Sequence, residues 1–464
     1  MHGNVGFHRF RMTIFQVRLG MLIVMFAFAS WTTSGFGQSA TTQPAPATTE
    51  PSSDTLSLSP TTSPETEVVT LPSGPTVGLL AHSNGDIDQA LKEVHHQAAG
   101  IFPNGPTSLV YPGWKKVTDE LREKYGLDLG TETDFVYQGA TGGPGMREAG
   151  GGYTTLFGRW LLAGKADDEN VGYLKFKATY QWQIGDQAPA ALGKQIGSLW
   201  KTSDSFSENA PQISQLFWDQ RLFNNVLIID AGKLDPTNYY VTNLSANDKQ
   251  FFMSDVFSGI PAVGAPRNGL GMNAKFSPVP WFYLSAGFQE QEGTTSIHAV
   301  NDFFSDFDVF SSEEVGLCPD VPGLGKGNYR FTFWHAAGIP DQSAAVSDQG
   351  YALSFDQFIT QRALAFSRFE YDKGDLTGFR QLATAGFGYE ESLISKEDIV
   401  GLGAAYGAPS KSPFRNQYGA EAFYRVQLAP AEQLSFGYEL MVDPSFSPND
   451  HVVGVFWTRF RILF

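Results

Sequence analysis

The sequence predicts an all-β fold, a transmembrane antiparallel β-barrel of about sixteen strands that follows a short helical N-terminal segment. Charged residues form only 17% of the 464-residue chain, aromatic residues form 14%, and Gly occurs 49 times. Mean hydropathy is −0.19, so the chain is no bundle of membrane helices, which would show several apolar runs of about 20 residues. Apolar and polar residues alternate from Leu127 onward. This period is that of strands with one apolar and one polar face.

The first 37 residues have the pattern of an export signal. Arg9, Arg11 and Arg18 form a basic region, and the apolar run Leu19–Ala29 follows it directly. That run is too short to span a bilayer, which takes about 20 residues. We therefore predict that residues 1–37 are a removable signal peptide.

Two further segments precede the barrel. Residues 38–78 are rich in Thr, Pro and Ser and contain no Lys or Arg, so they should form a disordered tether. Residues 79–126 should be a short periplasmic segment, with one helix over 86–99 and another over 114–125, because apolar residues recur there at helical spacing.

The barrel is predicted to occupy residues 127–464. Clear alternation is visible in Leu127–Gln138, Leu174–Gln183, Tyr418–Leu428 and Leu434–Asp443. Several such segments have the length of about 9–11 residues that a tilted strand needs to cross a membrane. Sixteen strands of about 10 residues fit the available chain, and eighteen also fit. A soluble sandwich also alternates, but its polar face would carry more charge.

The last strand ends at Phe464, and counting back by two gives Ile462, Phe460, Thr458 and Phe456. A terminal Phe on such a strand resembles the signal that barrel assembly machinery reads in bacterial outer-membrane proteins. Aromatic residues near strand ends suit girdles at the two membrane interfaces.

Charge and cysteine content exclude several classes of ligand. The net charge of −16 repels nucleic acid, so nucleic acid is not expected as a partner. Cys318 is the single cysteine, and no Cys or His spacing typical of a metal site occurs, so we expect neither metal nor cofactor. The sequence lacks Gly-x-Ser-x-Gly and P-loop motifs, which argues against an enzyme.

The stretch Ile213–Phe257 contains a strand that closes with Gly232-Lys233-Leu234-Asp235, then Tyr239 and Tyr240, then a Phe-rich segment. This stretch, together with the closing segments from Tyr418 to Phe464, resembles the carbohydrate-selective porin family of the OprB type. The resemblance covers most of residues 111–464 and is weakest over 290–400.

The resemblance implies passive diffusion of mono- or oligosaccharides through a water-filled barrel in the outer membrane of a Gram-negative-type bacterium. It implies no covalent chemistry. The expected partners are sugars as permeating solutes, outer-membrane lipid and the barrel assembly machinery, and the protein would be a monomer or homotrimer. Two alternatives stay open: a general or structural barrel linked to the cell wall, and an outer-membrane barrel enzyme.

The candidate lumen residues are charged residues of both signs at inward strand positions. They are Lys175, Lys177, Asp219, Arg221, Glu421, Arg425, Glu439, Arg459 and Arg461. Paired charges would offer a sugar many donors and acceptors, and the structural alternative is that they only hydrate the lumen or brace one another. Lys233 and Asp235 rank highest because they stand at a strand end before a long segment.

Two segments are candidates for a loop that narrows the pore. One is residues 236–267. The other is residues 293–325, which combines six acidic residues with Phe and contains no Lys or Arg. An acidic, aromatic loop folded inward would exclude anions and let sugars stack, whereas an external loop could bind divalent ions at the membrane surface. The sequence does not choose between them.

Overall fold

The computed structural model describes residues 86–96, 98–243, 246–291, 293, 308–337, 347–390, 393–395 and 397–464. The predicted signal peptide, residues 1–37, and the predicted tether, residues 38–78, lie outside the described residues.

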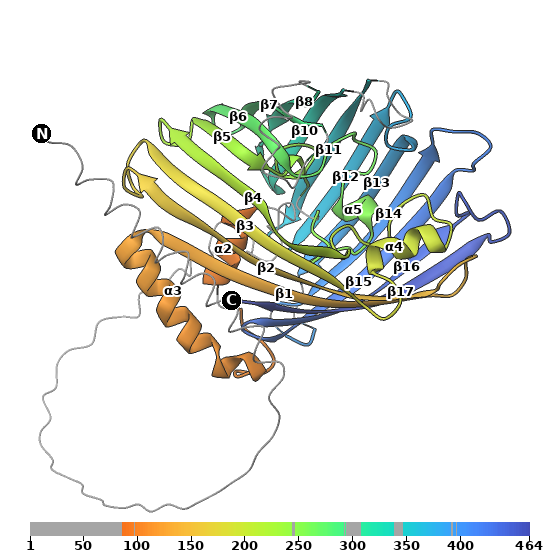
Figure 1. Cartoon of the computed structure of the whole chain (residues 1–464), viewed down its shortest axis with the longest axis horizontal. Coiled ribbons are helices and arrows are strands. Elements are labelled where there is room, and N and C mark those ends of the chain that lie inside the picture. The colour runs from red at the N-terminus through yellow and green to blue at the C-terminus, as the bar shows by residue number, and fades with distance from the viewer. Residues whose placement is uncertain are drawn as a thin grey trace, which may run out of the picture. The chain divides into compact units, whose positions relative to one another are not determined.

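Sixteen long antiparallel strands form a closed barrel (Figure 1). In chain order they are β1 (Leu127–Ala140), β2 (Glu148–Ala163), β3 (Val171–Ile184), β4 (Asn209–Leu222), β5 (Leu227–Leu234), β6 (Gly269–Val279), β7 (Phe282–Glu290), β8 (Val309–Leu317), β10 (Gly325–Ala336), β11 (Asp348–Thr360), β12 (Ala363–Asp372), β13 (Phe379–Glu390), β14 (Ile399–Pro409), β15 (Gln417–Ala429), β16 (Glu432–Val442) and β17 (Val452–Leu463). The two-residue β9 (Asp320–Val321) only extends a turn beside β10. Each strand pairs with its neighbours in the chain, and β1 pairs with β17 to close the ring. The predicted fold class and strand number are confirmed.

The strands have the polarity of a membrane barrel. On β1, Phe135 and Tyr137 are 40% and 39% exposed on the outer face, whereas Asp134 and Gln138, on the inner face, are fully buried. A soluble domain would reverse this distribution. Aromatic residues also stack across strands, as Tyr351 of β11 and Tyr371 of β12 do at 5.2 Å between ring centroids. The outer face therefore suits a lipid surround.

Helices lie at the start of the described chain and in the loops. They are α2 (Ile87–His95), η2 (Pro106–Leu109), α3 (Tyr111–Tyr125), α4 (Pro189–Gln195), η3 (Pro236–Asn238) and α5 (Asp255–Ser258). Within the described part of the chain, no helix combines the length and the apolar character that crossing a bilayer requires.

The first two predicted helices are present with shifted ends. The helix α2 stops at His95 instead of Ala99, because His96 is extended with ψ of 110°. The helix α3 begins at Tyr111, before the predicted Trp114, and it ends at Gly126, which adopts φ of +67°. Gly126 stops α3 as expected, because glycine tolerates this left-handed conformation.

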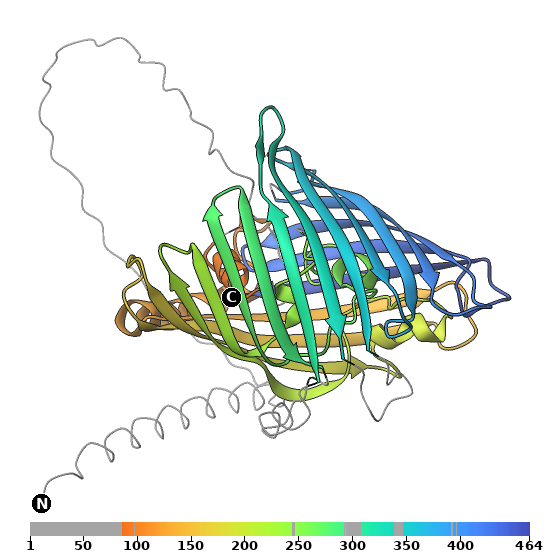
Figure 2. The ribbon, with the colours of Figure 1, turned by 90° about the horizontal axis from the view of Figure 1, so that it is seen from above.

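The interior of the barrel holds an apolar core that the alternating pattern does not predict. The loop after β3, residues 185–208, and the loop after β5, residues 235–268, both pack against inward-facing aromatic side chains of the wall. Members of this core include Phe206, Phe252, Phe257, Phe366, Phe423 and Trp457. Figures 1 and 2 show α5 within the ring of strands. The expectation of a polar inner face is thus correct for the charged positions and wrong for this part of the wall.

Candidate functional site

The loop of residues 235–268, here called the constriction loop, turns into the lumen at the end of β5. Asp235 caps the short helix η3, and its Oδ1 accepts hydrogen bonds from Thr237 N at 3.1 Å and Thr237 Oγ1 at 2.6 Å. The following residues Tyr240 and Val241 are buried, and the loop stays buried from Ala246 to Ile260. The structure places the described residues of 236–267, one of the two predicted candidates, inside the barrel.

Two glutamates of the wall hold the tip of the constriction loop. Glu421 on β15 accepts hydrogen bonds from Met253 N at 2.7 Å and from Ser254 N at 3.0 Å. Glu439 on β16 accepts from Ser254 Oγ and from Trp200 Nε1, both at 2.8 Å. A buried backbone N–H group without an acceptor destabilises the folded protein. Glu421 stabilises the loop because its carboxylate accepts hydrogen bonds from two such groups.

Arginines of the wall bind the carbonyl groups of the same loop. Arg459 Nη1 donates to Asp248 O at 2.5 Å and to Phe251 O at 3.1 Å. Arg425 Nη1 donates to Gln250 O at 3.3 Å. These side chains are 1% and 3% exposed, so they support the loop and do not face open solvent. The sequence left open that charged lumen residues have a structural role and do not contact a sugar. The contacts give such a structural role to Glu421, Arg425, Glu439 and Arg459.

The loop of residues 185–208 braces the constriction loop from its other side. The carboxylate of Asp248 accepts hydrogen bonds from Ser205 N and Ser205 Oγ, each at 2.7 Å. Burial raises the pKa of the carboxyl of Asp255, at the start of α5, to about 7, against the opposing effect of Lys201. The two loops thus form one packed unit in the lumen.

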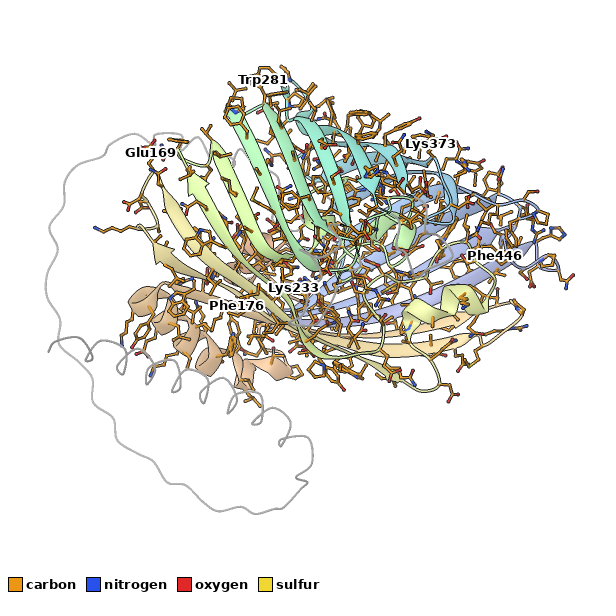
Figure 3. All side chains as sticks on the ribbon, turned by 45° about the horizontal axis from the view of Figure 1, so that its top comes forward. Glu169, Phe176, Lys233, Trp281, Lys373 and Phe446 are labelled. Carbon is orange, nitrogen blue, oxygen red and sulfur yellow. The ribbon has the colours of Figure 1, made fainter. Side chains whose placement is uncertain are left out.

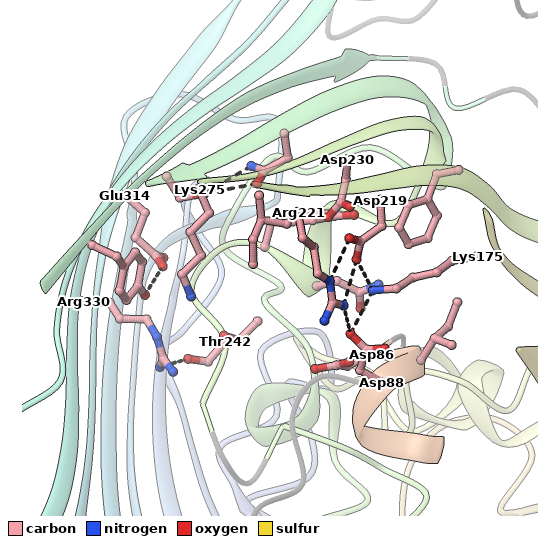
Figure 4. Close-up of a pocket in the computed structure, with 18 of the residues that line it drawn as sticks. Asp86, Asp88, Lys175, Asp219, Arg221, Asp230, Thr242, Lys275, Glu314 and Arg330 are labelled. Atoms are coloured by element: carbon pink, nitrogen blue, oxygen red, sulfur yellow. Dashed lines mark hydrogen bonds and ion pairs between the residues drawn. The ribbon is translucent and has the colours of Figure 1, made fainter. Parts of the chain in front are cut away.

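An open pocket of about 260 Å³ lies beside the constriction loop, along the inner wall from β3 to β10 (Figure 4). Four cations and five carboxylates line it, together with Phe217, Tyr239 and Tyr283. The charged lining residues are Asp86, Asp88, Lys175, Asp219, Arg221, Asp230, Lys275, Glu314 and Arg330.

One wall of the pocket is an ion-pair cluster. Lys175 Nζ lies 2.9 Å from Asp88 Oδ2, and it also pairs with Asp219. Arg221 Nε lies 2.9 Å from Asp219 Oδ1, and Arg221 pairs with Asp88 as well. Burial opposes ionisation of Asp88, but Lys175, Arg221 and Arg159 outweigh it and hold the pKa of this carboxyl well below its usual range. The structure thus brings the predicted residues Lys175, Asp219 and Arg221 together.

The opposite wall combines an aromatic ring with donors and acceptors. Lys275 Nζ lies 4.1 Å from the centroid of the Tyr283 ring. Tyr283 Oη donates to Glu314 Oε1 at 2.7 Å. Arg330 pairs with Asp356 at 2.9 Å and donates to Thr242 O of the constriction loop. Figure 4 shows Lys275 and Arg330 reaching toward the space between the two walls.

Four predicted residues lie elsewhere. Lys177 is buried next to the ring of Tyr153, 6.0 Å from its centroid. Arg461 Nε lies 2.5 Å from Glu132 Oε1, outside the pocket. Asp235 is used as a helix cap. Lys233, labelled in Figure 3, pairs in register with the outward-facing Leu216 and donates to Ile213 O at 2.9 Å. Lys233 is therefore on the outer strand face, and the structure does not bring it to the lumen.

The acidic candidate, residues 293–325, is not a single loop. Residues 309–317 form β8, on which Glu314 faces inward and is 2% exposed while Glu313 lies on the exposed face. Residues 294–307 lie outside the described residues. The part that the structure describes contributes Glu314 to the pocket wall.

Several pocket residues were not among the sequence candidates. Asp230, Lys275, Tyr283 and Arg330 lie on strands whose alternation is interrupted or short, although the two-residue period from a known inward position would have found them. No sequence pattern would have found Asp88. Helical spacing identifies the apolar face of α2, but it does not show that this face packs against the barrel wall. Among the described residues, no group of three or more His, Cys, Asp or Glu side chains is arranged to hold a metal ion.

The fold is similar to solved structures. The high-pH structure of Pseudomonas putida OprB aligns over 79% of this chain and 99% of its own, with a TM-score of 0.61 and 14% identity. The Salmonella typhi OmpF complex with daunomycin aligns over 73% of this chain and 97% of its own, with a TM-score of 0.50 and 11% identity. No protein-family model matches the chain, and no curated protein matches it. The resemblance to the OprB type is supported at the level of the fold.

Proposed function

We propose that this protein is an outer-membrane porin through which neutral sugars diffuse passively. The observation that carries the proposal is the open pocket inside a closed barrel, narrowed by the constriction loop and lined by charges of both signs. A neutral polyol that leaves water needs donors and acceptors to replace its hydration, and it must be held weakly enough to leave again. Mixed charges supply both without concentrating one kind of ion.

The aromatic lining favours sugars over other small neutral solutes. Tyr283 and Phe217 present ring surfaces to the pocket, and the C–H faces of a pyranose pack against such rings. The ammonium group of Lys275 lies over Tyr283 and has no hydrogen-bond partner among the described residues, so it is available to a hydroxyl group. The pocket is open and its lining extends from β3 to β10, so a sugar can pass along it without being enclosed.

The location follows from the outer face. Exposed apolar and aromatic side chains cover the strands, and a closed barrel satisfies all backbone groups in lipid. Together with the predicted signal peptide, these features support insertion in the outer membrane of a Gram-negative-type bacterium. The helix α3 would then lie on the periplasmic side, where the strands are joined by short turns, and α2 would reach from that side into the barrel.

Liposome swelling with refolded protein tests the proposal. Vesicles that contain the protein should swell in isosmotic solutions of neutral monosaccharides faster than in solutions of amino acids of similar size. Equal rates for all solutes of one size would instead support a general porin, and no swelling in any sugar would overturn the channel proposal.

A matched pair of lysine variants tests the pocket. Lys275→Met removes the ammonium group beside Tyr283 and should slow sugar entry, whereas Lys373→Met removes an exposed ammonium in the turn after β12 and should leave the rate unchanged. An equal effect of both substitutions would argue that the pocket does not contact the sugar.

A further inference from the structure

The helix α2 lies inside the barrel, against the wall. Its apolar side chains Ile87 and Leu91 are 3% and 1% exposed, and they pack with Phe157, Phe217 and Leu234, which face inward from β2, β4 and β5. Figures 1 and 2 both show α2 within the ring of strands. A helix in this position occupies part of the cross-section through which solutes would pass.

Hydrogen bonds at the barrel rim fix the chain that follows α2. Ile101 N donates to Gln427 O at 3.1 Å, and Phe102 N donates to Leu428 O at 2.8 Å, so these residues continue the edge of β15. Thr107 N and Thr107 Oγ1 both donate to Glu432 Oε1, at 2.9 and 2.7 Å. The position of α2 is therefore built into the fold and does not result from a loosely attached segment.

Carboxylates of α2 neutralise cations of the wall. Asp88 pairs with Arg159 at 3.1 Å, with Lys175 at 2.9 Å and with Arg221. Glu93 binds Arg461 through two contacts, at 2.5 and 2.9 Å. Glu93 also accepts a hydrogen bond from Gln250 Nε2 of the constriction loop at 2.6 Å. The helix is thus tied to both elements that shape the pore.

The sign of the charge in this region depends on α2. Apart from Asp86 and Asp88, the charged residues that line the pocket are the four cations Lys175, Arg221, Lys275 and Arg330 and the three carboxylates Asp219, Asp230 and Glu314. Without α2 and its capping residue Asp86, this lining has one cation in excess. With Asp86 and Asp88 present it has one carboxylate in excess, so the helix reverses the sign of the lining.

We propose that α2 determines the charge selectivity of the channel and makes it exclude anionic solutes, such as sugar phosphates and uronic acids, in favour of neutral sugars. The proposal rests on the channel function proposed above. Four cations in a narrow, partly dehydrated lumen would otherwise attract anions, because electrostatic interactions are strong where water is scarce. The carboxylates of α2 remove that attraction without removing the donors that bind a neutral hydroxyl group.

The reversal potential in planar bilayers, measured with the refolded protein under a potassium chloride gradient, tests this role. The D88N/E93Q variant keeps the size of both side chains, and we expect its permeability to chloride relative to potassium to rise about fivefold. The D119N/E120Q variant removes two carboxylates from α3, outside the barrel, and should behave as the wild type. A reversal potential in D88N/E93Q equal to that of the wild type would overturn the proposal.

A compensating substitution separates charge from structure. D88N alone should shift the reversal potential toward that of chloride, and D88N/K175M should return it to the wild-type value, because one cation is removed with one carboxylate. A helix that acts only by filling space would give no such return. If the wild type conducts ions but admits no sugar, the proposed sugar channel fails while the reversal potentials still decide the role of α2.

Liposome swelling in a hexose phosphate adds a readout in solutes of the proposed class. The wild type should admit the neutral hexose and exclude its phosphate, and D88N/E93Q should admit both. Entry of the phosphate through the wild type at the rate of the hexose would contradict the proposal.

Discussion

Glu421 on β15 and Glu439 on β16 are register partners, and both carboxylates hold Ser254 of the constriction loop. Two acids directly across a strand pair would normally repel each other. Here each of them satisfies donors of the loop, and the hydrogen bonds compensate for that repulsion. The narrowing of the pore thus depends on a pair of side chains that alternation alone would assign to the water-filled lumen.

Glu421→Gln should loosen the tip of the constriction loop. A glutamine offers one acceptor oxygen to the two donors Met253 N and Ser254 N, so a buried N–H would be left unsatisfied at a cost of about 1–3 kcal/mol. We expect noisier single-channel currents and a lower free energy of unfolding in detergent. Glu148→Gln, on the exposed start of β2, is the control. Currents as quiet as those of the wild type would show that Glu421 does not hold the loop.

Arg459→Met should expose the constriction loop to trypsin. Arg459 binds the carbonyl groups of Asp248 and Phe251, on either side of Lys249, which is 2% exposed and hence protected from cleavage. Loss of these charge-assisted bonds should allow cleavage after Lys249, detected by mass spectrometry of the fragments. Arg380→Met removes an arginine that binds the carbonyl groups of Asp372 and Lys373 at the end of β12, far from the constriction loop in the chain, and this variant should resist trypsin. Resistance of both variants would contradict the anchoring role.

The effect of Asp88 on ion selectivity should depend on pH only in acid. Because the pKa of Asp88 is lowered, its contribution to the docking of α2 is complete above the ordinary pKa of about 4 and is lost as the pH falls through the lower value of the folded state. The difference in reversal potential between the wild type and Asp88→Asn should therefore be constant from about pH 4 to pH 8 and shrink only well below pH 4, where the carboxylate of the folded protein takes up a proton. A difference that disappears near neutral pH would show that the ion pairs with Lys175, Arg221 and Arg159 are not formed.

Gly232→Ala should destabilise the barrel at the entry to the constriction loop. Gly232 has φ of +141°, and a Cβ atom there would lie 2.5 Å from Leu216 O, so both the backbone and the neighbouring strand oppose a side chain. We expect a loss of about 1–3 kcal/mol in the free energy of unfolding by urea in micelles. Gly113→Ala, where a Cβ atom would meet nothing within 4 Å, is the control. Equal unfolding midpoints for the two variants would contradict this account.

Phe464→Ala should impair assembly of the protein in the cell and leave the stability of the folded barrel nearly unchanged. The Phe464 ring stacks on Tyr111 at 5.8 Å, and its backbone exchanges two hydrogen bonds of 2.9 Å with Thr131, which alanine would keep. If assembly machinery reads the terminal Phe, the variant should accumulate poorly in outer membranes yet refold from urea into micelles with a yield near that of the wild type. Phe456→Ala, within β17, should leave the membrane level unchanged. A normal membrane level for Phe464→Ala would exclude this recognition.

The period of two in the sequence predicts which residues point inward, and the inward positions of Glu421, Arg425, Glu439 and Arg459 are as expected. What these residues contact depends on a loop far away in the chain, and local patterns carry no information on such contacts. Lys233 shows another limit. Asp230 and Lys233 are three residues apart, so they point to opposite faces of the strand. The residues before them, 226–229, are all apolar, so alternation does not indicate which of the two faces inward.

The placement of α2 shows a similar limit. Spacing in the sequence predicts its apolar face, and the same face would suit a helix packed on another helix or on the outside of the barrel. Only the structure shows that Asp88 and Glu93 meet the arginines and lysines of the wall.

The pairing of β1 with β17 means that a shortened chain does not give a smaller barrel. A protein lacking its last strand would leave β1 and β16 as two unpaired edges, and it would lack Arg459 and Arg461, the donors that bind the constriction loop and α2. Open edges of this kind recruit other chains and lead to aggregation. During biogenesis the polypeptide therefore needs protection until its C-terminus has been released and the ring can close.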